Sequence, residues 1–182
     1  LARFTFDGTT SDAAGGFSAG SSRGLVQYVG GLDGQALRLR SNGAAAFVAL
    51  TSANMALGRT DDFSVRFWTR TVQEADKRVV LLSQKEFSDN SLESQKEAGW
   101  VFYLSGGTWA WNMGSGVRRI TYERENGKHM PLNDGRWHQL TMTYSSTRSE
   151  IRLFYDGENG VTYHVSDAEG FDFTSGRPLV VG

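Results

Sequence analysis

Apolar and polar residues alternate along most of the chain, and the clearest alternation lies between residues 134 and 157. In both halves of this segment every second residue is mainly apolar: His138, Leu140, Met142, Tyr144, Ile151, Leu153 and Tyr155. A period of two residues is typical of antiparallel strands that are buried on one side only. The serine-rich stretch 145–149 predicts the connecting turn, and Asp156-Gly157 begins the next one, because an Asp-Gly pair tolerates a positive φ angle. The segment is therefore a predicted β-hairpin.

Similar short segments recur from end to end, separated by Gly, Asn, Asp or Ser, and no window of helical length has a convincing 3.6-residue apolar period. The predicted strands are Ala2–Phe6, Gly24–Tyr28, Ala36–Arg40, Ala46–Leu50, Phe63–Thr71, Arg78–Gln84, Trp100–Ser105, Thr108–Met113, Arg118–Glu123, Trp137–Tyr144, Ile151–Tyr155, Thr162–Val165 and Leu179–Val181. We expect an all-β fold in which two antiparallel sheets of about six or seven strands each pack face to face, as in jelly-roll sandwiches. Thr51–Gly58 is predicted to hold one helical turn, and the polar segment Phe87–Ala98 a long loop.

The composition agrees with this fold and excludes several functions. The length of 182 residues predicts a single domain over 1–182, and 22 Gly against 2 Pro with 12% aromatic residues suit an all-β chain. The net charge is −1 and no basic run exceeds Arg118-Arg119, so neither nucleic acid nor an anionic membrane surface is expected as a main partner. The absence of cysteine rules out disulfides, thiolate metal sites and a cysteine nucleophile. No apolar stretch has the length of a membrane span, and because the chain opens on strand-like residues we expect a segment of a larger multidomain protein.

Four stretches resemble motifs of one known superfamily. They are Phe4-Thr-Phe-Asp-Gly8, Gly31-Leu-Asp-Gly-Gln-Ala-Leu-Arg-Leu39, Asp62-Phe-Ser-Val-Arg-Phe-Trp-Thr-Arg70, and Gly135-Arg-Trp-His138 together with Phe154-Tyr-Asp-Gly157. In this order they resemble the laminin-G-like, concanavalin A-like lectin and glucanase superfamily, particularly the bacterial modules attached to larger secreted enzymes. The resemblance implies a two-sheet antiparallel β-sandwich in a secreted, periplasmic or cell-surface protein of bacteria.

A further pattern is similar to modules that stand beside bacterial phosphoesterases, sulfatases and glycan-degrading enzymes. It consists of Leu81-Leu-Ser-Gln-Lys85, Gly99-Trp100 and Trp111-Asn112. Members of the superfamily usually continue past the strand expected at Leu179–Gly182 into a final strand with an acidic pair. We find no such strand in this sequence. Either the segment ends early or a neighbouring part of the parent protein completes the sheet, and in both cases we expect the intact protein to cover the unpaired edge.

The resemblance also implies a structural calcium site. It brings Asp7, Asp12 and Asp33 together near two glycine-rich turns at one rim of the sandwich. Calcium takes 6 to 8 oxygen ligands, which two carboxylates, backbone carbonyls and water would supply. The alternative is ordinary turn chemistry, since an Asp before a Gly is favoured in turns of any protein.

The outward face of the strand expected around residues 63–70 suggests a binding surface. Alternation points Phe63, Val65 and Phe67 inward and places Arg66, Trp68 and Arg70 on the other face. A sugar ring stacks on an indole, while guanidinium groups bind hydroxyl, carboxylate or sulfate groups. Tyr103, Trp109 and Trp111 are further candidates for ligand contact. The alternative for each aromatic side chain is packing in the core, where large aromatic residues usually lie.

No catalytic arrangement is found. A glycosidase of this superfamily needs paired carboxylates on one strand, and neither Glu123 with Glu125 nor Glu150 with Asp156 gives that geometry. His138 is interpreted as a structural residue, and it forms no zinc site with His129 and His164, which are scattered along the chain.

The leading function is a non-catalytic carbohydrate-binding or accessory module of a larger secreted enzyme. The alternatives are a structural module that packs on a neighbouring catalytic domain (phosphoesterase, sulfatase or glycosidase) without a free ligand, and a glycosidase or lyase.

Overall fold

The computed structural model describes residues 1–16, 20–40, 46–50, 57–73, 78–87, 91–123, 130–165 and 171–182. Within these residues the chain is almost entirely β, as predicted, and every strand pairing is antiparallel. The strands are β1 (Ser21–Arg23), β2 (Leu25–Gly30), β3 (Gln35–Arg40), β4 (Phe47–Leu50), β5 (Phe63–Thr69), β6 (Val79–Ser83), β7 (Gly99–Ser105), β8 (Thr108–Gly114), β9 (Arg119–Glu123), β10 (His138–Ser145), β11 (Glu150–Tyr155), β12 (Glu158–His164) and β13 (Leu179–Val181). The helix α1 spans Leu92–Lys96.

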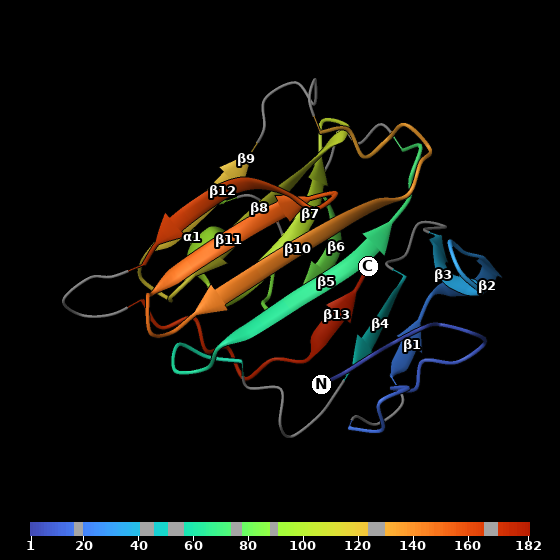
Figure 1. Ribbon diagram of the computed structural model, residues 1–182, viewed down its shortest axis with the longest axis horizontal. Coiled ribbons are helices and arrows are strands. Elements are labelled where there is room, and N and C mark those ends of the chain that lie inside the picture. The colour runs from blue at the N-terminus through green and yellow to red at the C-terminus, as the bar shows by residue number, and fades with distance from the viewer. Residues whose placement is uncertain are drawn as a thin grey trace.

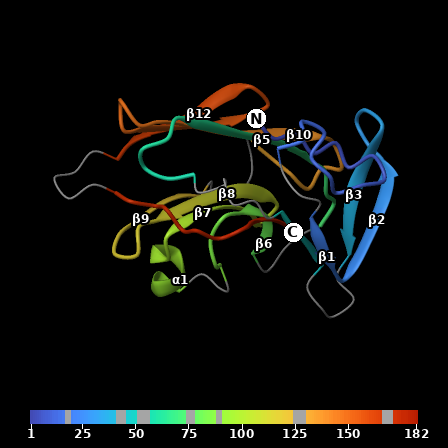
Figure 2. The same ribbon diagram turned by 90° about the horizontal axis from the view of Figure 1, so that it is seen from below.

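Two sheets lie face to face and form the sandwich (Figures 1 and 2). The larger sheet has seven strands in the order β1-β4-β13-β6-β7-β8-β9, and the smaller has four in the order β12-β11-β10-β5. Among the described strands, β2 and β3 pair only with each other, and they stand at one end of the sandwich (Figure 2). The predicted sandwich is thus confirmed, but the expected division into two sheets of similar size is wrong. One reason is that Ala2–Phe6 forms no strand: Phe6 has a φ of 58°, which is incompatible with an extended chain.

The core between the sheets is built mainly from aromatic side chains of β7 and β8. Trp100, Phe102, Trp109 and Trp111 are completely buried there and face the apolar row of β10 and β11, which consists of Leu140, Met142, Ile151 and Leu153. Ring contacts join the two layers: Phe67 meets Phe102 edge-on at 5.4 Å, and Trp111 stacks on Tyr163 at 6.0 Å. Burying an apolar side chain of this size stabilises the fold by about 2–3 kcal/mol, so this layer dominates stability.

The outer side of the seven-stranded sheet is also covered, in part by α1. Ser91 caps this helix, since its side chain accepts a hydrogen bond from the backbone of Ser94. Below it lies the buried Lys85, whose Nζ donates to the Gln95 carbonyl at 3.0 Å and to Asn112 Oδ1 at 2.7 Å. Burial lowers the pKa of Lys85 to about 8, against a smaller opposing effect of the Glu97 charge. The prediction of a long loop at 87–98 therefore missed a short helix, because five residues are too few to show a helical period.

The last strand lies inside the larger sheet and not at its edge. Residues 179–181 of β13 pair with β4, and Val180 and Val181 pair with β6 on the other side. β13 is therefore not an unpaired edge, and β1 and β9 form the borders of the seven-stranded sheet. The helical turn predicted at Thr51–Gly58 falls largely outside the described residues.

The tight joint between β6 and β7 gives a test of the fold. Gly99 has a φ of 116°, and an added Cβ would lie 2.2 Å from the backbone carbonyl oxygen of Gln84. We expect Gly99→Ala to lower the free energy of unfolding by more than about 3 kcal/mol, because backbone strain and a backbone clash add together. Gly116→Ala is the matched control: its φ is 86° with nothing within 4 Å of the added Cβ, and it should cost only about 1–2 kcal/mol. Equal losses for both variants in urea unfolding would contradict this packing.

Candidate functional site

The outward side of the four-stranded sheet carries the predicted binding residues that are accessible. Strand pairing arranges its side chains in rows across β5, β10 and β11: Trp68 lies opposite Gln139, Arg66 opposite Thr141, and Thr141 opposite Phe154. We call this surface the four-stranded face, and its members are Arg66, Trp68, Arg70, Trp137, Gln139, Thr141, Arg152 and Phe154. The alternation predicted for residues 63–70 is confirmed, since Phe63, Val65 and Phe67 pack against the core while Arg66, Trp68 and Arg70 are exposed.

Trp68 is the most unusual residue on this face. Its side chain is 47% exposed, and no other Phe, Trp or Tyr of the described residues is as exposed. Its neighbours two positions away along the chain are Arg66 in β5 and Arg70 directly after β5. The Arg70 guanidinium lies 5.5 Å from the ring centre of Trp137. A cation held over an aromatic ring keeps its N–H groups available at the edge of the stack. The structure thus brings together an open indole and two guanidinium groups on one side of a sheet.

Sequence reasoning missed five members of this face, namely Trp137, Gln139, Thr141, Arg152 and Phe154. The alternation that places Gln139 and Thr141 outward extends back to Trp137, so this residue was recognisable from the sequence. Arg152 and Phe154 are outward by the same argument within β11. Their closeness to β5 depends on the pairing register, which the sequence does not state.

Three predicted ligand-binding residues do not reach the surface. Trp109 and Trp111 are 0% exposed and belong to the core between the sheets. Tyr103 is also 0% exposed, under Phe87, and its hydroxyl donates to Glu123 Oε1 at 2.6 Å. The alternative interpretation, packing, holds for all three, because β7 and β8 are covered on both faces. They are removed from the candidate binding surface.

The three aspartates of the expected calcium site are not brought together. Among the described residues no group of three His, Cys, Asp or Glu side chains could share a metal ion. Asp12 is buried, and its carboxylate accepts backbone N–H groups of Arg3 at 2.7 Å, Ala14 at 2.9 Å and Gly16 at 2.8 Å. Asp7 accepts the backbone N–H of Gln35 at 2.6 Å, while Asp33 is exposed. The contacts of Asp12 and Asp7 agree with the alternative of turn chemistry, and a calcium site that uses Asp7, Asp12 or Asp33 with backbone carbonyls stays a prediction.

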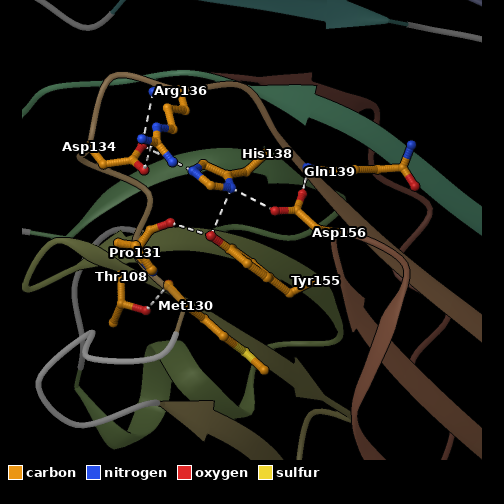
Figure 3. Close-up of polar contacts among 9 residues, drawn as sticks. All are labelled: Thr108, Met130, Pro131, Asp134, Arg136, His138, Gln139, Tyr155 and Asp156. Carbon is orange, nitrogen blue, oxygen red and sulfur yellow. Dashed lines mark hydrogen bonds and ion pairs between the residues drawn. The ribbon is translucent and has the colours of Figure 1, made fainter.

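A polar cluster around His138 holds the end of the four-stranded face (Figure 3). His138 Nδ1 lies 2.8 Å from Asp156 Oδ2, and Nε2 lies 3.0 Å from Asp134 Oδ1. The second oxygen of Asp156 accepts the backbone N–H of Gln139 at 2.7 Å. The Tyr155 hydroxyl lies 2.7 Å from His138 Nδ1 and donates to the Pro131 carbonyl at 2.7 Å. The loop before β10 is thereby fixed against the turn that follows β11.

The same cluster reaches across to the other sheet. Pro131 forms an isolated bridge with Thr108 of β8, and the Thr108 hydroxyl donates to the Met130 carbonyl at 2.7 Å (Figure 3). His138 itself is only 7% exposed, and both of its ring nitrogens are engaged. This arrangement agrees with the structural role predicted for His138, since a general base needs a nitrogen that a substrate can reach.

The charges around His138 determine its titration. Burial lowers the pKa of His138, but hydrogen bonds and charge attraction from Asp156 and Asp134 outweigh it, so that the pKa lies above the ordinary 6.5. A protonated imidazole donates to both carboxylates at once. The cluster therefore favours the imidazolium form in the folded protein.

This shift predicts how stability depends on pH. Because the folded pKa is raised, the contribution of His138 is fully present below about pH 6.5 and is lost as the pH rises through the folded pKa. We expect His138→Gln to lower the free energy of unfolding by about 2 kcal/mol at pH 6 and by clearly less at pH 9. Urea unfolding of both proteins across this range measures the difference. Subtracting the stability of the variant from that of the wild type at each pH cancels the contribution of Lys85. Because the pKa of Lys85 is lowered to about 8, that contribution increases the stability of both proteins as the pH rises above 8. The exposed His164→Gln is the control, and a pH-independent difference for His138→Gln would contradict the assignment.

The backbone contacts of Asp12 give a test of the expected calcium site. We expect Asp12→Ala to cost about 2–4 kcal/mol in calcium-free buffer, because three backbone N–H groups lose a charged acceptor. Asp33→Ala, which replaces an exposed carboxylate, should change stability by less than about 0.5 kcal/mol. Thermal melts of the three proteins with excess calcium and with chelator check the result. A melting midpoint that calcium raises in the wild type but not in Asp12→Ala would restore a metal role for this residue.

Comparisons with known proteins agree with the architecture. The family described as the concanavalin A-like lectin/glucanases superfamily matches residues 40–182, which confirms the resemblance seen in the motifs after residue 40. The motifs at 4–8 and 31–39 precede this match. None of the described helices is long and apolar enough to cross a membrane.

Two proteins of Paraclostridium bifermentans have similar sequences. The chain is 25% identical to its non-toxic nonhemagglutinin over 145 residues, and 22% identical to paraclostridial mosquitocidal protein 1 over 161 residues. These alignments cover 78% and 82% of this chain but only 11% and 12% of the two relatives.

Solved structures show the same fold. The binding domain of paraclostridial mosquitocidal protein 1 superposes with a TM-score of 0.68 at 18% identity, covering 93% of this chain and 40% of that one. The binding domain of botulinum neurotoxin serotype C1 gives a TM-score of 0.63 at 15% identity, with 93% and 39% covered. At these identities the likeness establishes the fold.

Proposed function

We propose that this chain, which belongs to the concanavalin A-like lectin/glucanases superfamily, is a non-catalytic module that binds carbohydrate through the four-stranded face. In this proposal it works outside the cell as one domain of a larger bacterial protein. The protein that carries it supplies any catalytic activity.

The exposure of Trp68 is the observation that carries this proposal. Trp100, Trp109 and Trp111 are completely buried, whereas Trp68 leaves almost half of its side chain in water. An exposed indole on a rigid strand costs little entropy when a ligand binds, because the strand pairing with β10 already fixes its backbone. Gln139 and Thr141 lie beside it with hydrogen-bonding side chains that suit sugar hydroxyls. Stacking with nearby polar groups is the usual design of a shallow saccharide site.

The acidic side chains near this face favour binding over catalysis. A glycosidase needs two carboxyl groups that flank the scissile bond. Glu150 Oε1 is held by Arg152 Nε at 2.7 Å, and Asp156 is held by His138 and by the backbone of Gln139. Both carboxylates are therefore engaged in structural contacts.

The comparisons support a binding role without naming a ligand. Two of the similar structures are binding domains of larger toxins, and this chain spans only 11–12% of the curated relatives it matches. Both observations suit an accessory module within a longer protein.

A glycan array with the isolated domain tests the proposal. We expect binding to at least one glycan, and we expect Trp68→Ala to weaken it tenfold or more, because the stacking surface is lost. The thermal midpoint should change little, since the side chain is half exposed. Leu25→Ala is the matched control: Leu25 is also 47% exposed but lies on β2, away from the face. No binding to neutral, uronic or sulfated glycans would instead support a module that packs on its neighbouring domain.

A further inference from the structure

We infer that the ligand of the four-stranded face is an anionic saccharide, whose sulfate or carboxylate groups are bound by Arg66 and Arg70 on either side of Trp68. This inference rests on the proposed function and specifies its ligand class. It follows from the charges of the face, from the spacing of its side chains along β5 and from the composition of the whole chain.

Arg66 is the cation most available to a ligand. It is exposed in the middle of β5, opposite Thr141, and its side chain has neither a hydrogen bond nor an ion pair within the described part of the chain. Arg70 lies against the Trp137 ring, which orients its guanidinium while leaving the N–H groups at the edge free to donate. Two guanidinium groups therefore face solvent beside Trp68.

The acidic groups on and beside the face are already committed. Glu150 is paired with Arg152 at 2.7 Å and lies 3.7 Å from Arg148. Asp62, at the other end of β5, accepts from the Ser146 backbone at 2.6 Å and from its hydroxyl at 2.7 Å. Asp134 and Asp156 enclose His138. Within the described part of the chain, the charges of Arg66 and Arg70 consequently have no acidic partner on this face, and a ligand oxyanion would be their complement.

The spacing of these groups suits a chain of sugars. Residues two apart on a strand are separated by about 7 Å, so Arg66 and Arg70 lie about 7 Å from Trp68 on opposite sides. A sugar ring stacked on the indole places the substituents of that ring and its neighbours within reach of both guanidinium groups. A guanidinium group donates two parallel hydrogen bonds to two oxygens of a carboxylate or of a sulfate group, which gives geometric selectivity. Ser64, Thr141 and Gln139 surround the row and offer partners for hydroxyl groups.

The composition of the chain argues for a saccharide over other polyanions. The net charge of the chain is −1. Among the described residues, Arg66 and Arg70 are the two arginines beside Trp68 that have no acidic partner. A nucleic-acid surface uses many phosphate contacts and a strongly basic face. Here charge alone gives little affinity, so a ligand must also stack on the indole.

Matched pairs of oligosaccharides provide the test. Oligogalacturonate and its methyl ester share one backbone and differ in charge, and sulfated and desulfated galactan oligosaccharides form a second pair. Calorimetry with the wild-type domain should show at least tenfold tighter binding of the charged member in one pair or both. The preference should weaken between low and physiological ionic strength.

Variants separate the inference from the function on which it rests. We expect Arg66→Ala to weaken binding of the charged member at least tenfold and binding of the uncharged member by much less, so that most of the preference is lost, and we expect Arg66→Lys to retain part of it. Trp68→Ala should weaken both members. Arg23→Ala, which removes an exposed arginine on β1 in the other sheet, is the control and should change neither.

The outcomes are distinct. Equal binding of charged and uncharged members that still depends on Trp68 overturns the inference and leaves the carbohydrate-binding function intact. Tight binding of inorganic polyphosphate that is indifferent to Trp68→Ala shows nonspecific anion attraction and overturns the inference. Absence of binding to every probe overturns both the inference and the proposed function.

Discussion

The aromatic layer between the two sheets is the interaction on which the rest of the structure depends. Because Trp100, Phe102, Trp109 and Trp111 fill the space above β10 and β11, the inner rows of the four-stranded sheet are fully used in packing. The outer rows of that sheet are then free of any packing requirement. A half-exposed tryptophan is tolerable there because the strand that carries it is held by its inward neighbours Val65 and Phe67.

The two sheets differ in what lies on their outer sides, and this difference separates support from recognition. The seven-stranded sheet carries α1 and a buried polar network around Lys85, so that its central strands are covered on both faces. The four-stranded sheet carries no such cover in the described structure. The cluster of His138, Asp134, Asp156 and Tyr155 holds the loop before β10 and thereby positions Trp137 against Arg70. The buried cluster around His138 thus fixes one end of the four-stranded face.

The sequence predicted the sandwich, most of its strands and the outward position of Trp68, because a period of two is a local property of each strand. It failed for Tyr103, Trp109 and Trp111, since in strands covered on both faces alternation no longer separates exposed from buried positions. The partnership of Arg70 with Trp137 required the register of β5 against β10, which joins residues far apart in sequence. The contacts of Asp12 likewise depend on local backbone N–H groups, which no sequence motif indicates.

The position of β13 has a consequence for how the domain reaches its folded state. This strand is the bridge between two halves of the larger sheet, with β1 and β4 on one side and β6 to β9 on the other (Figure 1). During synthesis on the ribosome the early strands must therefore wait, with open backbone groups, until residues 179–181 emerge. Contacts of such long sequence separation slow folding and expose strand edges to other chains. The two halves of the larger sheet can thus join only after Leu179–Val181, the last of its strands in the sequence, have paired with β4 and β6.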